Sequence, residues 1–135
     1  MLDSLWPWMH LGARLLFALS VMITSLGHFT TPDTFAGYAA AKGVPSPKAA
    51  VLLSGLMMWS GALLVALGWH RFIGAGLVIL FLVPVSLKMH AYWNQPDPAI
   101  RQNDKFIFWR NVGLIGGALF FATYARWEWP MSLGG

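Results

Sequence analysis

Basic and aromatic side chains gather around one loop of an otherwise apolar chain. The stretch of residues 86–111 holds four of the nine Lys and Arg residues and one histidine. We expect these groups to meet two others that follow the first apolar segment, in a cluster at one membrane face formed by His28, Tyr38, Lys88, His90, Trp93, Arg110 and Asn111. Cationic donors beside aromatic walls suit an anionic or carbonyl-bearing amphiphile such as a quinone headgroup, since ionisable groups in membrane helices are often functional. The alternative is that each side chain only reaches the lipid headgroups.

The composition is typical of an integral membrane protein. Hydrophobic residues make up 57% of the 135 residues and charged residues 10%, against about 25% charged residues in a soluble domain. The net charge of +4 comes without a basic stripe on a polar face, so we expect lipid headgroups and no nucleic acid as its partner. Because the chain has no cysteine, thiol exchange and thiolate ligation of metals are excluded.

Four apolar segments predict an all-α membrane protein, a four-helix transmembrane bundle. Each segment is close to the roughly 20 residues that cross a bilayer core. The predicted spans cover about residues 11–29, 49–68, 72–90 and 106–124, within a single domain of residues 1–135. Between the first two spans, Pro32 and Asp33 predict the start of a short interfacial helix that stops at Gly43. With four spans, both termini lie on the same side of the membrane.

Three further features indicate how the ends and faces of the spans are placed. Gly113 and Gly117 have the G-x-x-x-G spacing that permits a close helix contact, and Arg110 lies on the same face. Arg14 stands in the first turn of the first span, from where we expect its side chain to extend back to the headgroups. Residues 126–129 include two Trp and predict an interfacial ending.

The four histidines raise the question of a haem site, with His10 and His70 at one face and His28 and His90 at the other. His10 and His28 are eighteen residues apart. That separation is about 27 Å of helix, which would place both in the headgroups and not inside the bundle. Since no predicted span contains a carboxylate, we expect no zinc or di-iron site. A channel or transporter is disfavoured because the middle of each predicted span lacks charged residues.

The order and spacing of several motifs resemble the DoxX family of small four-helix membrane proteins. The motifs are RLLFALSVMITSLGHF (residues 14–29), YAAAKGVPSP (38–47), LGWHRFIGAGL (67–77), HAYWN (90–94) and DKFIFWRNVGLIGGALFF (104–121). Positions that match recurrent family features are Arg14, Gly27, His28, Tyr38, Gly43, Pro45, His90, Trp93, Arg110 and Asn111, with Lys frequent in the family at positions 28 and 110. The resemblance implies a bacterial inner-membrane protein with a redox-associated role, because the family is named after a subunit of a thiosulfate:quinone oxidoreductase.

The sequence therefore predicts an integral membrane subunit of a redox-associated system. It would bind a quinone or a lipid headgroup at the face formed by the loop between spans one and two and the loop between spans three and four. Electrons would come from a partner or a bound cofactor, since the chain itself carries no visible redox centre. The alternative is a non-catalytic structural or assembly subunit that packs against other membrane subunits or against itself. Whether the chain is catalytic is left open.

Overall fold

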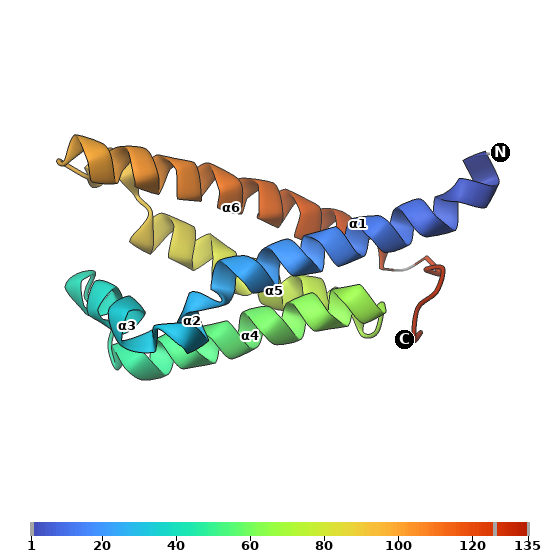
Figure 1. The fold of residues 1–135 in the computed structure, drawn as a ribbon, viewed down its shortest axis with the longest axis horizontal. Coiled ribbons are helices and arrows are strands. Elements are labelled where there is room, and N and C mark those ends of the chain that lie inside the picture. Colours follow the sequence, from blue (N-terminus) through green and yellow to red (C-terminus); the bar gives the residue numbers. More distant parts are fainter. Residues whose placement is uncertain (1, 126, 135) are drawn as a thin grey trace.

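The fold is a bundle of four long helices, as a computed structural model describes for residues 2–125 and 127–134 (Figure 1). Position 126 of the predicted interfacial ending lies outside the described residues. In chain order the elements are α1 (Leu2–Ser25), α2 (Gly27–Thr30), α3 (Pro32–Ala41), α4 (Pro47–Leu67), α5 (Arg71–Met89), the 3-10 helix η1 (Tyr92–Asn94) and α6 (Pro98–Tyr124). Four segments are long and apolar enough to cross a membrane, which confirms the predicted all-α transmembrane bundle.

The bounds of the middle helices agree with the sequence to within two residues, but the outer helices are longer than predicted. α1 begins nine residues before the predicted start at position 11, and a break at Leu26 separates it from α2. α6 begins at Pro98, eight residues before the predicted start at position 106. Its N-cap is Asp97, whose side chain accepts hydrogen bonds from the backbone N–H groups of Ala99 and Ile100, both at 2.9 Å.

The short helix between the first two spans is present and lies against the start of α4. It begins at Pro32, and the chain leaves it through Gly43, whose φ of +72° lies in the left-handed region that favours glycine. Both chain ends lie at the opposite end of the bundle (Figure 1).

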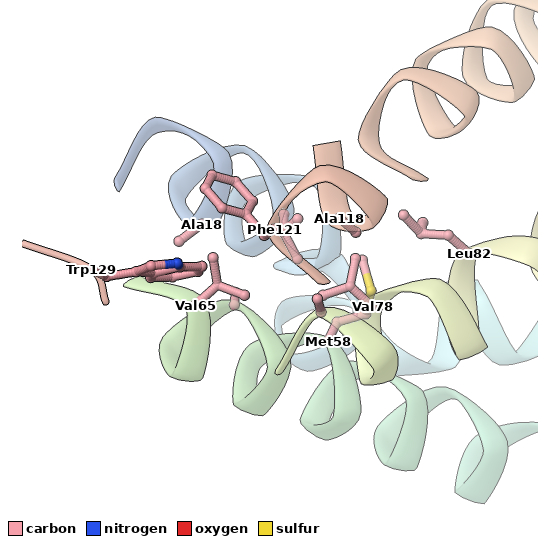
Figure 2. Close-up of a cluster of buried hydrophobic side chains, with 11 residues drawn as sticks. Ala18, Met58, Val65, Val78, Leu82, Ala118, Phe121 and Trp129 are labelled. Atoms are coloured by element: carbon pink, nitrogen blue, oxygen red, sulfur yellow. The ribbon is translucent and has the colours of Figure 1, made fainter. Parts of the chain in front are cut away.

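Neighbouring helices pack in sequence order, with α1 on α4, α4 on α5 and α5 on α6. Small residues bring α4 and α5 together, because a Cβ atom at Gly61 would lie 2.8 Å from the carbonyl oxygen of Gly74. The core between the helices is built from the buried side chains shown in Figure 2, including Met58, Val78 and Phe121.

α1 and α6 approach each other near the end where the termini lie and diverge towards the end where α3 lies (Figure 1). A Cβ atom at Gly117 would lie 3.1 Å from the ring of Phe17 on α1, so this glycine makes room for a side chain. A Cβ atom at Gly113 would meet nothing within 4 Å. Of the predicted glycine pair, only Gly117 is therefore in contact with another helix in the described part of the chain.

The chain after α6 folds back over the end of the bundle, and Arg14 holds it there. Nη1 of Arg14 donates to the carbonyl oxygen of Pro130 at 2.9 Å, and Nη2 donates to that of Met131. The Arg14 side chain is 1% exposed, so the prediction that it extends to the headgroups is wrong. Trp129, predicted as an interfacial residue, is also buried and lies beneath the guanidinium.

Candidate functional site

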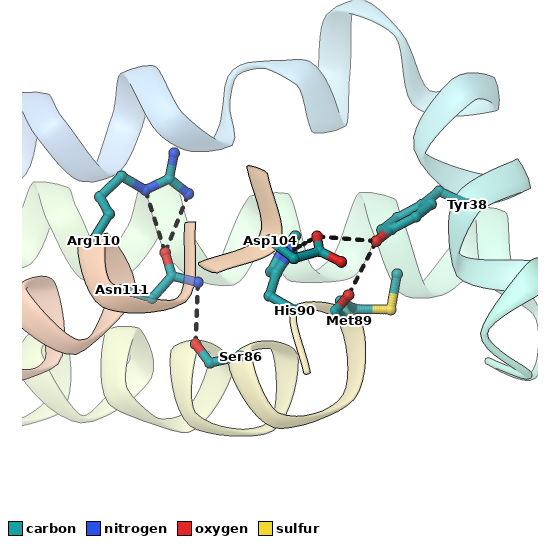
Figure 3. A network of polar contacts seen from close by, with 7 residues as sticks. All are labelled: Tyr38, Ser86, Met89, His90, Asp104, Arg110 and Asn111. Carbon is teal, nitrogen blue, oxygen red and sulfur yellow. Dashed lines mark hydrogen bonds and ion pairs between the residues drawn. The ribbon is translucent and has the colours of Figure 1, made fainter. Parts of the chain in front are cut away.

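Three polar side chains from three elements meet at the end of the bundle where α3 lies. Nδ1 of His90 lies 3.0 Å from Oδ1 of Asp104 on α6, and the hydroxyl of Tyr38 on α3 lies 3.4 Å from the same oxygen. The Tyr38 hydroxyl also donates to the carbonyl oxygen of Met89 at 3.0 Å. We call Tyr38, His90 and Asp104 the acid cluster; Figure 3 shows their arrangement.

The ends and faces of the helices explain this convergence. α5 ends at Met89, so His90 is the first residue after the helix, and its ring reaches α6. Asp104 and Asn111 are seven residues apart on α6, about two helical turns, and therefore share one face. Both are buried, at 1% and 2% exposure. The first half of the buried face of α6 is thus polar.

The carboxylate of Asp104 is only partly satisfied. Oδ1 faces the donors of His90 and Tyr38, whereas Oδ2 is buried and has no hydrogen-bond partner in the described part of the chain. A buried polar atom without a partner is costly, so Oδ2 is a candidate atom for contact with a bound group. Burial, and next the charge of the Asp104 carboxylate, raise the pKa of the Tyr38 hydroxyl above its ordinary value. Tyr38 therefore stays protonated and acts as a donor.

A second network connects α6 to α5 about two turns further along. Nη2 of Arg110 donates to Oδ1 of Asn111 at 3.1 Å, and Nδ2 of Asn111 donates to Oγ of Ser86 at 3.1 Å. The Ser86 hydroxyl in turn donates to the carbonyl oxygen of Leu82 at 2.6 Å. Figure 3 shows this arginine network (Ser86, Arg110, Asn111) beside the acid cluster. The buried amide holds the guanidinium in a fixed direction.

Beyond Arg110, a groove of about 450 Å³ runs between α1 and α6. Aliphatic side chains form most of its wall, and Arg110 is the one charged residue among the described residues that line it. The full lining is Leu16, Leu19, Ser20, Ile23, Thr24, Arg110, Gly113 and Leu114.

The structure divides the predicted seven-residue cluster. Tyr38 and His90 belong to the acid cluster and Arg110 and Asn111 to the arginine network, whereas three residues lie elsewhere. His28 is buried between Phe35 and Phe81, with Nδ1 directed at the carbonyl oxygen of Ser25 at 3.0 Å. Lys88 is exposed on α5, and Trp93 is 53% exposed and packs on Tyr92 and Phe108.

The main residue that the sequence analysis missed is Asp104. The predicted span of residues 106–124 contains no carboxylate, but α6 begins eight residues earlier at Pro98 and therefore also carries Asp104. Two signals point to it: the Asp97–Pro98 pair that starts the helix, and the seven-residue spacing from Asn111.

For metals and haem, the described residues contain no group of three or more His, Asp or Glu side chains that could hold a metal ion. His10, considered as a haem ligand, lies between the rings of Trp6 and Trp129, each 4.9 Å from it. His70 is the N-cap of α5, and its ring lies 4.6 Å from that of Trp69. The geometry gives no support for a bis-histidine haem site at these positions.

Comparison with known proteins adds one distant relative. No family model matches the chain, and no solved structure matches it. Over 116 residues the chain is 28% identical to the inner membrane protein YphA of Escherichia coli (strain K12). The aligned region covers 86% of this chain and 82% of that protein. Together with four helices able to span a bilayer, this similarity identifies the chain as a multi-pass membrane protein of the cell membrane, in a lipid environment.

Proposed function

We propose that the protein is a membrane subunit of a redox-associated system and binds a quinone headgroup at the acid cluster. The observation that carries the proposal is the meeting of Tyr38, His90 and Asp104 at one end of a membrane bundle, with one carboxylate oxygen unpartnered in the described residues. The cluster is formed where α3 and the start of the α5–α6 loop meet, at the face where the sequence places the ligand.

The cluster suits a quinone because quinone carbonyl oxygens accept hydrogen bonds and take up protons on reduction. Asp104 receives the hydrogen on Nδ1 of His90, which leaves Nε2 as the ring atom that meets a ligand. Imidazole is the side chain whose charge changes most readily near neutral pH, so it serves as the proton donor to a quinone oxygen. The electrons come from a partner redox protein in this proposal.

The resemblance to the DoxX family supports the same function, because the family is named after a subunit that works with quinone. Tyr38, His90, Arg110 and Asn111 are among the positions that match recurrent family features. In the structure these four residues form both polar networks, although nothing in the family resemblance requires them to be adjacent. A lipid headgroup is the other ligand that the same donors would accept.

The second candidate function is a non-catalytic assembly subunit. It is favoured by the bare surface of α6, where Cβ atoms at Gly113 and at Gly116 would meet nothing within 4 Å. Such a surface lets the backbone of another helix approach closely. In that case the polar networks hold α3, α5 and α6 together and bind nothing.

Quinone content of the purified protein separates the two functions. The variants are His90→Asn and Asp104→Asn, and the control is His70→Asn, which changes a histidine at the other end of the bundle. Asn tolerates the positive φ of position 70. We expect quinone at stoichiometric amount in extracts of the wild type and the control, and its loss from both cluster variants. A wild type that carries a large partner subunit and no quinone would favour the assembly function.

A further inference from the structure

We propose that the groove between α1 and α6 binds one anionic phospholipid, with the phosphate at Arg110 and an acyl chain along the groove. The site is separate from the acid cluster, because Asp104 faces α5 and α3 whereas Arg110 lines the opening towards α1. The inference does not rest on quinone binding.

The groove lies between the contact of α1 with α6 on one side and Arg110 on the other. We call the side of the helix contact its closed end and the side of Arg110 its open end. At the closed end the ring of Phe17 lies against Gly117 and 5.2 Å from the ring of Phe121. Because α1 and α6 run in opposite directions, seven residues along each helix from this contact lead to Thr24 and Arg110 at the open end. The distance from closed to open end is therefore about 10 Å. The first part of an acyl chain fits along this length, with the polar end of the lipid at Arg110.

The positive charge of Arg110 determines which kind of lipid headgroup the groove accepts. Two ion pairs occur between described residues, Lys48 with Asp33 and His90 with Asp104, so Arg110 has no carboxylate partner among them. Its Nε and Nη2 atoms both approach Oδ1 of Asn111, which uses part of the five N–H donors of a guanidinium. The remaining donors suit a phosphate oxygen, because arginine recognises phosphate in a forked geometry.

The depth of Arg110 matches that of a lipid phosphate. The roughly 20 residues needed to cross the hydrocarbon core, counted back from the end of α6 at Tyr124, reach position 105. Arg110 then lies about 7 Å inside the core boundary, within reach of the headgroup region for a long side chain. A second hollow of about 410 Å³ on the outer side of α6 is lined by Lys105 as well as Arg110. Arg110 thus borders both hollows, and Lys105 adds a second positive charge to the outer one.

A second copy of this chain does not supply the missing anion. The chain has five acidic residues, which are Asp3, Asp33, Asp97, Asp104 and Glu128. Asp97 precedes α6, Asp33 lies in α3 and Asp3 and Glu128 lie near the termini, so none faces lipid at the depth of Arg110, and Asp104 is buried. An anionic lipid carries its negative charge in the headgroup region, which the Arg110 side chain can reach.

The test is native mass spectrometry of the full chain released from detergent that contains equal amounts of phosphatidylglycerol and phosphatidylcholine with the same acyl chains. Arg110→Gln removes the charge, and Gly113→Leu fills the groove from a position with open space. The controls are Gly116→Leu, which has equally open space outside the lining, and Arg101→Gln, whose side chain donates to the carbonyl oxygens of Gln95 and Pro96 in the loop before α6.

We expect the wild type to retain one phosphatidylglycerol in preference to phosphatidylcholine by about tenfold, because the cationic choline of phosphatidylcholine repels Arg110 and offsets the attraction of the phosphate that both lipids carry. Arg110→Gln loses the preference, Gly113→Leu loses both lipids, and the two controls behave as the wild type. Equal retention of both lipids by the wild type overturns the proposal, as does an unchanged preference in Arg110→Gln. A dimer that Gly113→Leu abolishes, or displacement of the lipid by added ubiquinone, assigns the groove to another occupant. We expect His90→Asn, which alters the acid cluster, to retain phosphatidylglycerol as the wild type does. Failure of the quinone proposal can then be told apart from failure of this one.

Discussion

His90 and Asp104 lie fourteen residues apart in the chain, and yet their side chains meet with Nδ1 3.0 Å from Oδ1. The contact joins the end of α5 to the second turn of α6 and closes the loop that contains η1. The hydroxyl of Tyr38 on α3 contacts the same oxygen at 3.4 Å. One carboxylate therefore holds three elements together at the end of the bundle where the ligand is proposed to bind.

Asp104→Asn is expected to lower the free energy of unfolding by about 1–3 kcal/mol, because it removes the charge of a buried carboxylate that faces the donors of His90 and Tyr38. The measurement is unfolding in mixed micelles with increasing sodium dodecyl sulfate. The matched control is Asp97→Asn, which replaces one good helix cap with another and leaves the unfolding curve in place. Equal shifts for the two variants would contradict the role given to Asp104.

Stability is expected to fall as the pH rises beyond about 10, the ordinary pKa of tyrosine. Burial and the Asp104 carboxylate raise the pKa of Tyr38 in the folded state, so the unfolded chain loses this proton first. The unfolded state then binds fewer protons than the folded state, and stability decreases with pH. Tyr38→Phe removes this part of the pH dependence. Thermal unfolding of both proteins between about pH 8 and about pH 11 measures the difference; parallel curves would count against the assignment.

Gly74→Ala is expected to destabilise the bundle by about 1–3 kcal/mol through overpacking. Its Cβ atom would lie 2.7 Å from Cβ of Leu64 and 3.0 Å from the carbonyl oxygen of Gly61. Gly76→Ala is the control on the same helix, since its Cβ atom would meet nothing within 4 Å. That change raises helix propensity and is expected to stabilise by up to about 1 kcal/mol. Opposite signs in the same unfolding assay are the expected result.

Arg14→Met is expected to release the segment after α6, because the carbonyl groups of Pro130 and Met131 lose their donor. The backbone N–H of Leu133, which donates to the carbonyl oxygen of Leu67 at 3.0 Å, reports this change through hydrogen exchange. We expect the protection of this N–H to fall. The free energy of opening should decrease by about 1.5–3 kcal/mol, the contribution of a hydrogen bond to a charged group. Leu15→Met, an exposed neighbour, serves as control; unchanged protection in Arg14→Met would show that the other contacts of the segment hold it without this arginine.

The helices themselves could be predicted because their signals are local. α4 carries no charged residue after Lys48, and Gly68, which follows it, has a positive φ as a helix-ending glycine often does. The start of α6 was misplaced because hydropathy rises only at Phe106, although the Asp97 cap stands nine residues earlier. Hydropathy locates where a helix enters lipid, whereas the cap locates where the helix begins.

The site could be predicted only in part because its contacts join distant segments. The sequence indicates that Tyr38 and His90 share a membrane face, but it does not show that Asp104 turns inward between them. His28 lies near the same end and yet faces aromatic rings, since its position on α2 is set by the break at Leu26. The groove depends on the angle at which α1 and α6 diverge, which no single segment encodes.

The burial of Arg14 has a consequence for the order in which the protein is made. The acceptors of its guanidinium lie 116 and 117 residues later, so they are synthesised after all four long helices. Throughout elongation, the first helix carries an arginine whose final partners do not yet exist, and a charge inside a bilayer is costly until it is matched. The first helix is therefore completed by residues 130 and 131, and its arginine finds its final partners only after the fourth long helix has been made.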